Sequence, residues 1–123
     1  MMKIAVTAHG QDQNATVDSR FGRANYFVVY DQIAGSWSYH DNTQNLETAH
    51  GAGIQAAQNL IKTGAQVLIT GNVGPKAFKV LSTGGVKIYS VGNASSTVSE
   101  AIKLFNAGEL PEIAAPNALE IKK

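Results

Sequence analysis

Both arginines of the chain lie in one short segment, residues 18–23, which reads DSRFGR, and all other fixed positive charge is lysine. A guanidinium group offers five N–H donors in a rigid fork that matches anions with several acceptor atoms, whereas a lysine is a point charge. The presence of both arginines in one segment therefore indicates an anion site around Arg20 and Arg23. The alternative is an ordinary surface loop in which these arginines pair with Asp12 and Asp18.

The distribution of charge along the chain also favours the binding of an anion. The net charge is only +1, which does not suggest a broad nucleic-acid surface. From Thr48 to Ser99, however, there is no aspartate or glutamate, and the four charged residues there are Lys62, Lys76, Lys79 and Lys87. A site built from this stretch would lie in a field that attracts anions. The alternative is that these lysines merely solvate the edges of helices and strands.

The composition excludes several classes of site. The chain has 123 residues and no cysteine, so disulfides, zinc–thiolate sites and cysteine nucleophiles are ruled out. No apolar run is long enough for a membrane span, and the amino terminus does not read as a signal peptide, so we expect a cytoplasmic protein. We expect one α/β domain over residues 1–110 and an irregular tail over 111–123.

The elements that must position the arginines follow from the apolar pattern. Three strand-like runs precede an alternation of helices and strands, and Thr97 with Glu100 forms a capping box. The predicted strands are residues 4–8, 26–30, 37–40, 67–69 and 86–91, and the predicted helices begin near residues 54, 75 and 98. Short antiparallel connections followed by right-handed crossovers predict a mixed five-stranded sheet with strand order 3-2-1-4-5 and three helices, which is a ribonuclease-H-like three-layer α/β fold.

This strand order has a switch point where the connections of the first and fourth strands leave in opposite directions, and such points bind ligands. Three loops are expected to meet there, residues 9–25, 71–74 and 92–96. The second loop, which consists of Gly71, Asn72, Val73 and Gly74, leads into a helix amino terminus suited to an anion.

A fourth segment, His50-Gly51-Ala52-Gly53, precedes the first helix. Gly51 and Gly53 would let backbone N–H groups approach a ligand, and His50 would add an imidazole. The alternatives are simple turn geometry for the glycines and a packing or capping role for His50.

These residues give less support to an enzymatic function than to a binding function. No serine–histidine–acid arrangement is recognisable, and Asp12, Asp18 and Asp31 do not form the carboxylate cluster that two-metal hydrolysis needs. We therefore expect a binding protein with no catalytic residues and no direct metal ligands.

Three motifs give the chain a resemblance to a known family. Residues 18–27, 49–53 and 71–77, within a match that covers residues 3–108, resemble the dinitrogenase iron–molybdenum cofactor binding family, and most closely its small orange proteins. The resemblance implies a ribonuclease-H-like fold and noncovalent binding of an anionic cluster, either a molybdenum–copper sulfide cluster or the iron–molybdenum cofactor or its precursor. It also implies that the cluster is surrounded by Arg20, Arg23, His50 and residues 71–74, with Phe21 and Val73 as a possible apolar wall, although both could simply be core residues.

The implied role is storage, delivery or assembly of the cluster, with cofactor-assembly proteins or an ATPase as possible partners and with no nucleic acid or membrane. Two other functions stay open at this point. One is a regulatory interaction domain that has lost the cluster, in which Trp37, Tyr39 and the tail would matter. The other is a module that binds small oxyanions or nucleotides at the same helix termini.

Overall fold

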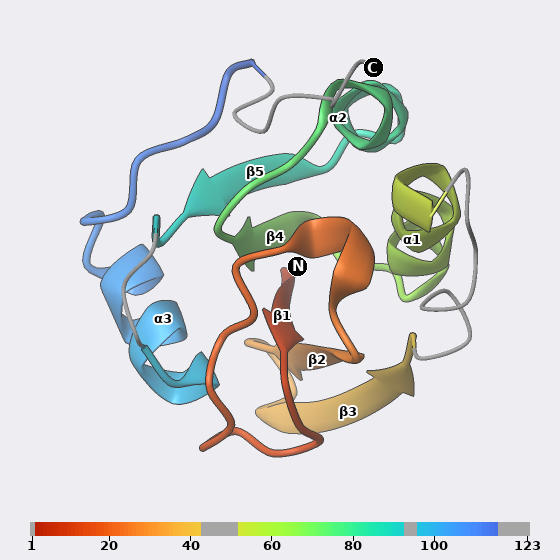
Figure 1. Ribbon diagram of the computed structural model, residues 1–123. Coiled ribbons are helices and arrows are strands. Elements are labelled where there is room, and N and C mark those ends of the chain that lie inside the picture. Colours follow the sequence, from red (N-terminus) through yellow and green to blue (C-terminus); the bar gives the residue numbers. More distant parts are fainter. Residues whose placement is uncertain (1, 43–51, 93–95, 116–123) are drawn as a thin grey trace.

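The computed structural model describes residues 2–42, 52–92 and 96–115, and Figure 1 shows them as a single sheet with helices on both faces. In chain order the elements are β1 (Lys3–Ala8), the 3₁₀ turn η1 (Phe21–Arg23), β2 (Tyr26–Asp31), β3 (Ser36–Asp41), α1 (Ala52–Lys62), β4 (Val67–Thr70), α2 (Pro75–Thr83), β5 (Lys87–Ser90) and α3 (Val98–Asn106).

The sheet has the predicted strand order, β3-β2-β1-β4-β5. β2 pairs antiparallel with both β1 and β3, while β4 pairs parallel with β1 and β5. The mixed α/β fold class, the order of the five strands and the three α-helices of the described residues are therefore confirmed. None of these helices is long and apolar enough to span a membrane.

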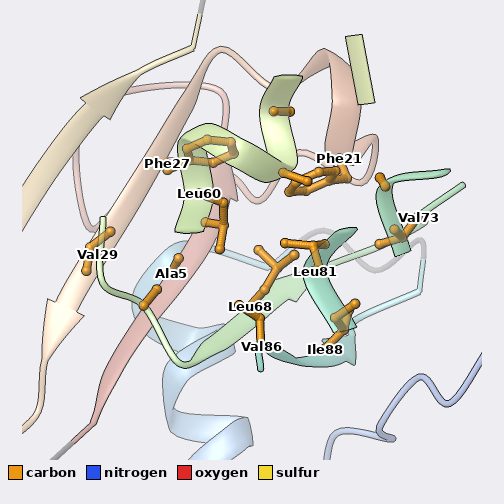
Figure 2. Packing of buried hydrophobic residues seen from close by; sticks show 14 residues of the cluster. Ala5, Phe21, Phe27, Val29, Leu60, Leu68, Val73, Leu81, Val86 and Ile88 are labelled. Carbon is orange, nitrogen blue, oxygen red and sulfur yellow. The ribbon is translucent and has the colours of Figure 1, made fainter. Parts of the chain in front are cut away.

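Two apolar layers hold the helices on the sheet. Successive side chains of a strand point to opposite faces, so Ala5 faces one layer and Ile4 and Val6 the other. The first layer packs under α1 and α2, with Leu60 and Leu81 at its centre, and Figure 2 shows this cluster. The second layer packs under α3, through Val98, Ala101 and Ile102. The central strands β1 and β4 are apolar on both faces because both faces are covered.

Local sequence explains where the helices begin. Pro75 occupies the first turn of α2, where its missing N–H breaks no bond. The predicted capping box is present at α3: Thr97 Oγ1 accepts from Glu100 N at 3.2 Å, and Glu100 Oε1 accepts from Thr97 N at 2.9 Å. A cap of this kind fixes the position of the helix start, and α3 starts where the loops after β1 and β5 meet.

The turn η1 lies within the segment that the sequence indicated only as a long polar loop. Its first residue, Phe21, is buried, and its ring stacks on that of Phe27 in β2 with centroids 5.9 Å apart. Figure 2 shows that Phe21 and Val73, from two different loops, enter the same cluster as Leu81 of α2. Burial of this aromatic ring therefore fastens the arginine-bearing segment to the core.

The carboxy-terminal segment covers the outer edge of β5. Ser90 N donates to Pro111 O at 3.0 Å, and Ile113 N donates to Ile88 O at 2.7 Å. A sheet edge leaves backbone groups unpaired, and this short segment pairs some of them. Residues 116–123 of the predicted tail lie outside the described residues.

Replacing Phe21 with alanine is expected to lower the free energy of unfolding by about 3–5 kcal/mol, the usual cost of deleting a buried aromatic ring. Denaturant unfolding followed by circular dichroism measures this change. Ile33→Ala is the control, because Ile33 is 71% exposed and its truncation is expected to cost less than about 0.5 kcal/mol. Equal effects of the two substitutions would contradict an anchoring role for Phe21.

Candidate functional site

The loops after β1 and β4 are joined by their backbones. Asn72 N donates to Ser19 O at 2.7 Å, and Phe21 N donates to Asn72 O at 3.2 Å. These bonds make a short parallel bridge between Arg20 and Asn72. In Figure 1 the arginine-bearing segment crosses the ends of β1 and β4. Two of the three predicted loops therefore meet at the carboxyl edge of the sheet.

The same long loop also contacts the start of α3. Val17 N donates to Ser96 O at 2.8 Å, and Val98 N donates to Ala15 O at 2.9 Å. The described part of the third predicted loop, Gly92 and Ser96, thus lies at this edge as well. Residues 93–95 lie outside the described residues.

Buried hydroxyl groups connect the strand ends to these loops. Thr7 of β1 donates its hydroxyl to Asp18 O at 2.6 Å, and the hydroxyls of Thr7 and Thr70 are 2.7 Å apart. In β5, Ser90 Oγ donates to Gly71 O at 2.9 Å and accepts from Gly92 N at 2.8 Å. The bonds to Asp18 O, Gly71 O and Gly92 N pair backbone groups of the loops with side chains at the strand ends. We refer to Thr7, Thr70 and Ser90 as the strand-end hydroxyls.

The glycines of the second loop have different surroundings. A Cβ atom on Gly71 would lie 2.5 Å from Ser19 Cβ and 2.7 Å from Gly92 O, so a side chain there would force two loops apart. Gly74, the N-cap of α2, has an ordinary φ of −77° and makes no side-chain cap, and a Cβ there would meet no described residue within 4 Å. Gly71 is therefore a structural requirement, whereas Gly74 has room for a side chain among the described residues.

Arg20 is held by Asp18. Asp18 Oδ1 lies 3.2 Å from Arg20 Nε, and Oδ2 lies 3.3 Å from Nη2. The carboxylate is only 1% exposed, whereas the arginine side chain is 63% exposed. The hydrogen bond that Arg20 donates to Asp18, and secondly the negative charge of Asp18, raise the pKa of Arg20. The surface-loop alternative is thus correct on one point, because Arg20 does pair with Asp18.

His9 extends this arrangement toward solvent. Its Nδ1 lies 3.5 Å from Asp18 Oδ2, and its side chain is 51% exposed. The sequence interpretation missed the role of Asp18, which joins Arg20, His9 and the end of β1. The one available signal was the position of Asp18 two residues before Arg20, since an aspartate often bonds the backbone N–H two residues on.

The other predicted site residues fall into three groups. Arg23 ends η1 and is exposed, and Gly53 lies in the first turn of α1, where a Cβ would be 3.4 Å from Ala77 Cβ of α2. Val73 is fully buried, so its side chain, like that of Phe21, belongs to the core. His50 and Gly51 lie outside the described residues.

The described residues contain no group of three or more histidine, aspartate or glutamate side chains placed to hold a metal ion. His40 lies in β3, and burial, followed by the charge of Lys3, lowers its pKa. The groups that the loops do bring together are guanidinium, imidazole and backbone N–H donors around one carboxylate. Such an edge can bind an anion through hydrogen bonds and charge.

The sequence is similar to those of known proteins. A sequence model described as dinitrogenase iron-molybdenum cofactor matches residues 2–108. The chain is 30% identical over 112 residues to an uncharacterized protein of Methanocaldococcus jannaschii, a match that covers 89% of this chain and 90% of that protein.

Two solved structures are similar over nearly their whole length. The apo form of the orange protein from Desulfovibrio gigas is 46% identical with a TM-score of 0.90, and the match covers 96% of this chain and 98% of that one. A putative NifB protein from Thermotoga is 37% identical with a TM-score of 0.82, and the match again covers 96% and 98% of the two chains.

Replacing Thr7 with valine keeps the shape of the side chain but removes its hydroxyl, so that Asp18 O loses its 2.6 Å donor. Asp18 O would keep only the longer 3.5 Å contact from Thr70 Oγ1, so the substitution is expected to lower the free energy of unfolding by about 1–3 kcal/mol. Denaturant unfolding measures it, and Thr83→Val is the control because Thr83 is an exposed residue at the end of α2. Unchanged stability in Thr7→Val would show that this bond does not hold the loop.

Proposed function

The chain belongs to the dinitrogenase iron–molybdenum cofactor family, and from this premise we propose that it binds an anionic molybdenum-containing metal–sulfur cluster noncovalently for storage, delivery or assembly. The cluster is a molybdenum–copper sulfide cluster or the iron–molybdenum cofactor or its precursor. It is cargo, and the protein performs no catalysis on it. The proposed site is the carboxyl edge of the sheet, with Arg20, Arg23, His50, Gly51, Gly53 and residues 71–74 around it.

The observation that carries the proposal is the joining of the arginine segment to the Gly71–Gly74 loop at one sheet edge. The bridge between Arg20 and Asn72 places a guanidinium-bearing segment beside the start of α2, whose N-cap residue, Gly74, makes no side-chain cap. Positive charge and the N–H groups of a helix amino terminus both stabilise an anion. A Cβ at Gly74 would have no described residue within 4 Å, which gives a bulky ligand room to approach.

The residues present suit a metal–sulfur cluster that is not ligated by thiolates. The chain contains no cysteine, so the metals would not be held by sulfur from the protein. The sulfides of such a cluster are weak hydrogen-bond acceptors with a spread negative charge, and guanidinium and backbone N–H groups can contact several of them at once. Among the described residues the one buried carboxylate is that of Asp18, which is already paired with Arg20 and so does not face the ligand as a bare charge.

The proposed setting is the cytoplasm. There, a cofactor-assembly protein or an ATPase would supply or receive the cluster. Noncovalent binding suits transfer, because release then requires no metal–protein bond to break. Neither nucleic acid nor a membrane is part of the proposal.

Reconstitution tests the proposal directly. Anaerobic protein is mixed with tetrathiomolybdate and copper(I), or with isolated iron–molybdenum cofactor, and then desalted. Retained visible absorbance with stoichiometric molybdenum is expected, and colourless protein under every condition would refute the proposal. Calorimetry with phosphate, molybdate and nucleotides tests the small-anion alternative, for which we expect little affinity.

Arg23→Ala and His50→Ala are each expected to lower cluster retention about tenfold, since a hydrogen bond from a charged group contributes roughly 1.5–3 kcal/mol. The thermal midpoint should change little. Lys79→Ala and His40→Ala are the controls, because they remove a positive charge and an imidazole from α2 and β3 rather than from the loops. Retention equal to wild type in both site variants would place the cluster elsewhere.

Gly74→Ser is expected to stay folded but to lose cluster retention. A serine at this position can cap α2, which is worth a few tenths of a kcal/mol over glycine, and its hydroxyl would occupy the N–H donors and space proposed for the ligand. Gly71→Ala is the contrasting variant, expected to cost about 1–3 kcal/mol in stability because its Cβ has no room. Thermal melts and retained absorbance are measured on both. A Gly74→Ser protein that retains the cluster fully would remove the first turn of α2 from the site.

A further inference from the structure

Asp18 binds Arg20 at three points. Its Oδ1 accepts from Arg20 N at 2.9 Å and from Nε at 3.2 Å, and its Oδ2 accepts from Nη2 at 3.3 Å. The backbone and the tip of the arginine are thus tied to one carboxylate two residues away. This closes a ring of hydrogen bonds that restricts the arginine side chain to one orientation.

The carboxylate is itself fixed to the sheet. Asp18 N donates to Thr7 O at 2.9 Å, and Asp18 O accepts from Thr7 Oγ1 at 2.6 Å. Thr70 of the neighbouring strand contacts the same hydroxyl at 2.7 Å. Because Asp18 is 1% exposed, the surrounding chain leaves it little freedom to move. The orientation of Arg20 is therefore determined, through Asp18, by the central strands β1 and β4.

The pairing leaves part of the guanidinium group available. Of the five N–H donors of an arginine side chain, Asp18 takes the one on Nε and one on Nη2. The remaining three donors, two on Nη1 and one on Nη2, belong to a side chain that is 63% exposed. An anion can bind there without breaking the bonds to Asp18. A side chain that is already ordered loses less conformational entropy when it binds.

We propose that Asp18 is a positioning residue for ligand binding, which holds Arg20 so that its Nη1 side faces the cluster. This inference rests on the proposed function. Two other roles for Asp18 predict different results. A purely structural role would act on the stability of the loop alone, and a purely electrostatic role would weaken anion binding by adding negative charge.

Asp18→Asn separates these roles. The asparagine Oδ1 can still accept from Arg20 N and so preserve the local turn, whereas the amide nitrogen in place of Oδ2 cannot accept from Nη2. Asp12→Asn is the matched control, because Asp12 is an exposed acid of the same loop whose Oδ1 accepts from Asn14 N at 2.6 Å. Both variants lose one negative charge, but only Asp18→Asn releases Arg20.

The first measurement needs no ligand. The chain has two arginines, so nitrogen-15 NMR spectra of the side chains contain two guanidinium groups, which Arg20→Ala assigns. In the wild type and in Asp12→Asn, rotation about the Nε–Cζ bond of Arg20 is expected to be slow, with separate Nη signals. In Asp18→Asn these signals are expected to merge. Unchanged Arg20 signals in Asp18→Asn would overturn the proposal.

The second measurement is cluster retention after reconstitution with tetrathiomolybdate and copper(I). Asp18→Asn is expected to lower retention about three- to tenfold, the range that follows from immobilising one flexible side chain. In an Arg20→Ala background, Asp18→Asn is expected to cause no further loss, because its effect runs through the arginine. Thermal midpoints are recorded for all variants.

The outcomes are distinguishable. Retention in Asp18→Asn that equals or exceeds the wild type overturns the positioning role but leaves the proposed function standing. A loss that persists in the Arg20→Ala background also overturns it and assigns Asp18 a structural role in the loop. A wild-type protein that retains no cluster refutes the proposed function and the inference together.

Discussion

The site depends on a pair of buried hydroxyls at the ends of β1 and β4. Thr7 and Thr70 are 2.7 Å apart, and Thr7 also bonds the backbone carbonyl of Asp18 at 2.6 Å. A loop of polar residues has little apolar surface to hold it in place, so its position must come from hydrogen bonds to something rigid. Here the rigid partner is the centre of the sheet, where both strands are buried on both faces. The path of the arginine segment is therefore set by the strand ends.

Packing complements these bonds from the other side of the segment. Phe21 enters the core under α1 and α2, while the preceding residues bond the start of α3. The loop is thus fastened at three places, to the core, to the strand ends and to a helix start. Between these anchors lie Asp18, Ser19 and Arg20, whose backbone contacts Asn72 of the second loop. Preorganisation of this kind lets exposed polar groups bind a ligand without a large entropic cost.

The kinds of ligand that the carboxyl edge of the sheet can bind depend both on the groups present there and on the absence of cysteine. Without any cysteine, the protein has no thiolate to ligate a metal, and the described loops offer hydrogen-bond donors and positive charge instead. Binding of that kind is reversible and discriminates by shape and charge. Binding of this kind suits the carrier function proposed above, and the family to which the chain belongs is described by a cofactor.

The sequence by itself determined the strand order, the helix starts and the capping box of α3, because these follow from apolar periodicity, proline and hydroxyl positions, and the handedness of crossovers. It also indicated that the arginine loop and the Gly71–Gly74 loop meet, since the topology places both at one edge. Only the tertiary structure decided that Arg20 pairs with Asp18, that Val73 and Phe21 are core residues, and that Gly71 rather than Gly74 is needed for close packing. Those features depend on the close approach of segments far apart in the chain or on the rotamer of one side chain. Periodicity fixes which face a residue takes, but such contacts depend on the relative placement of whole elements.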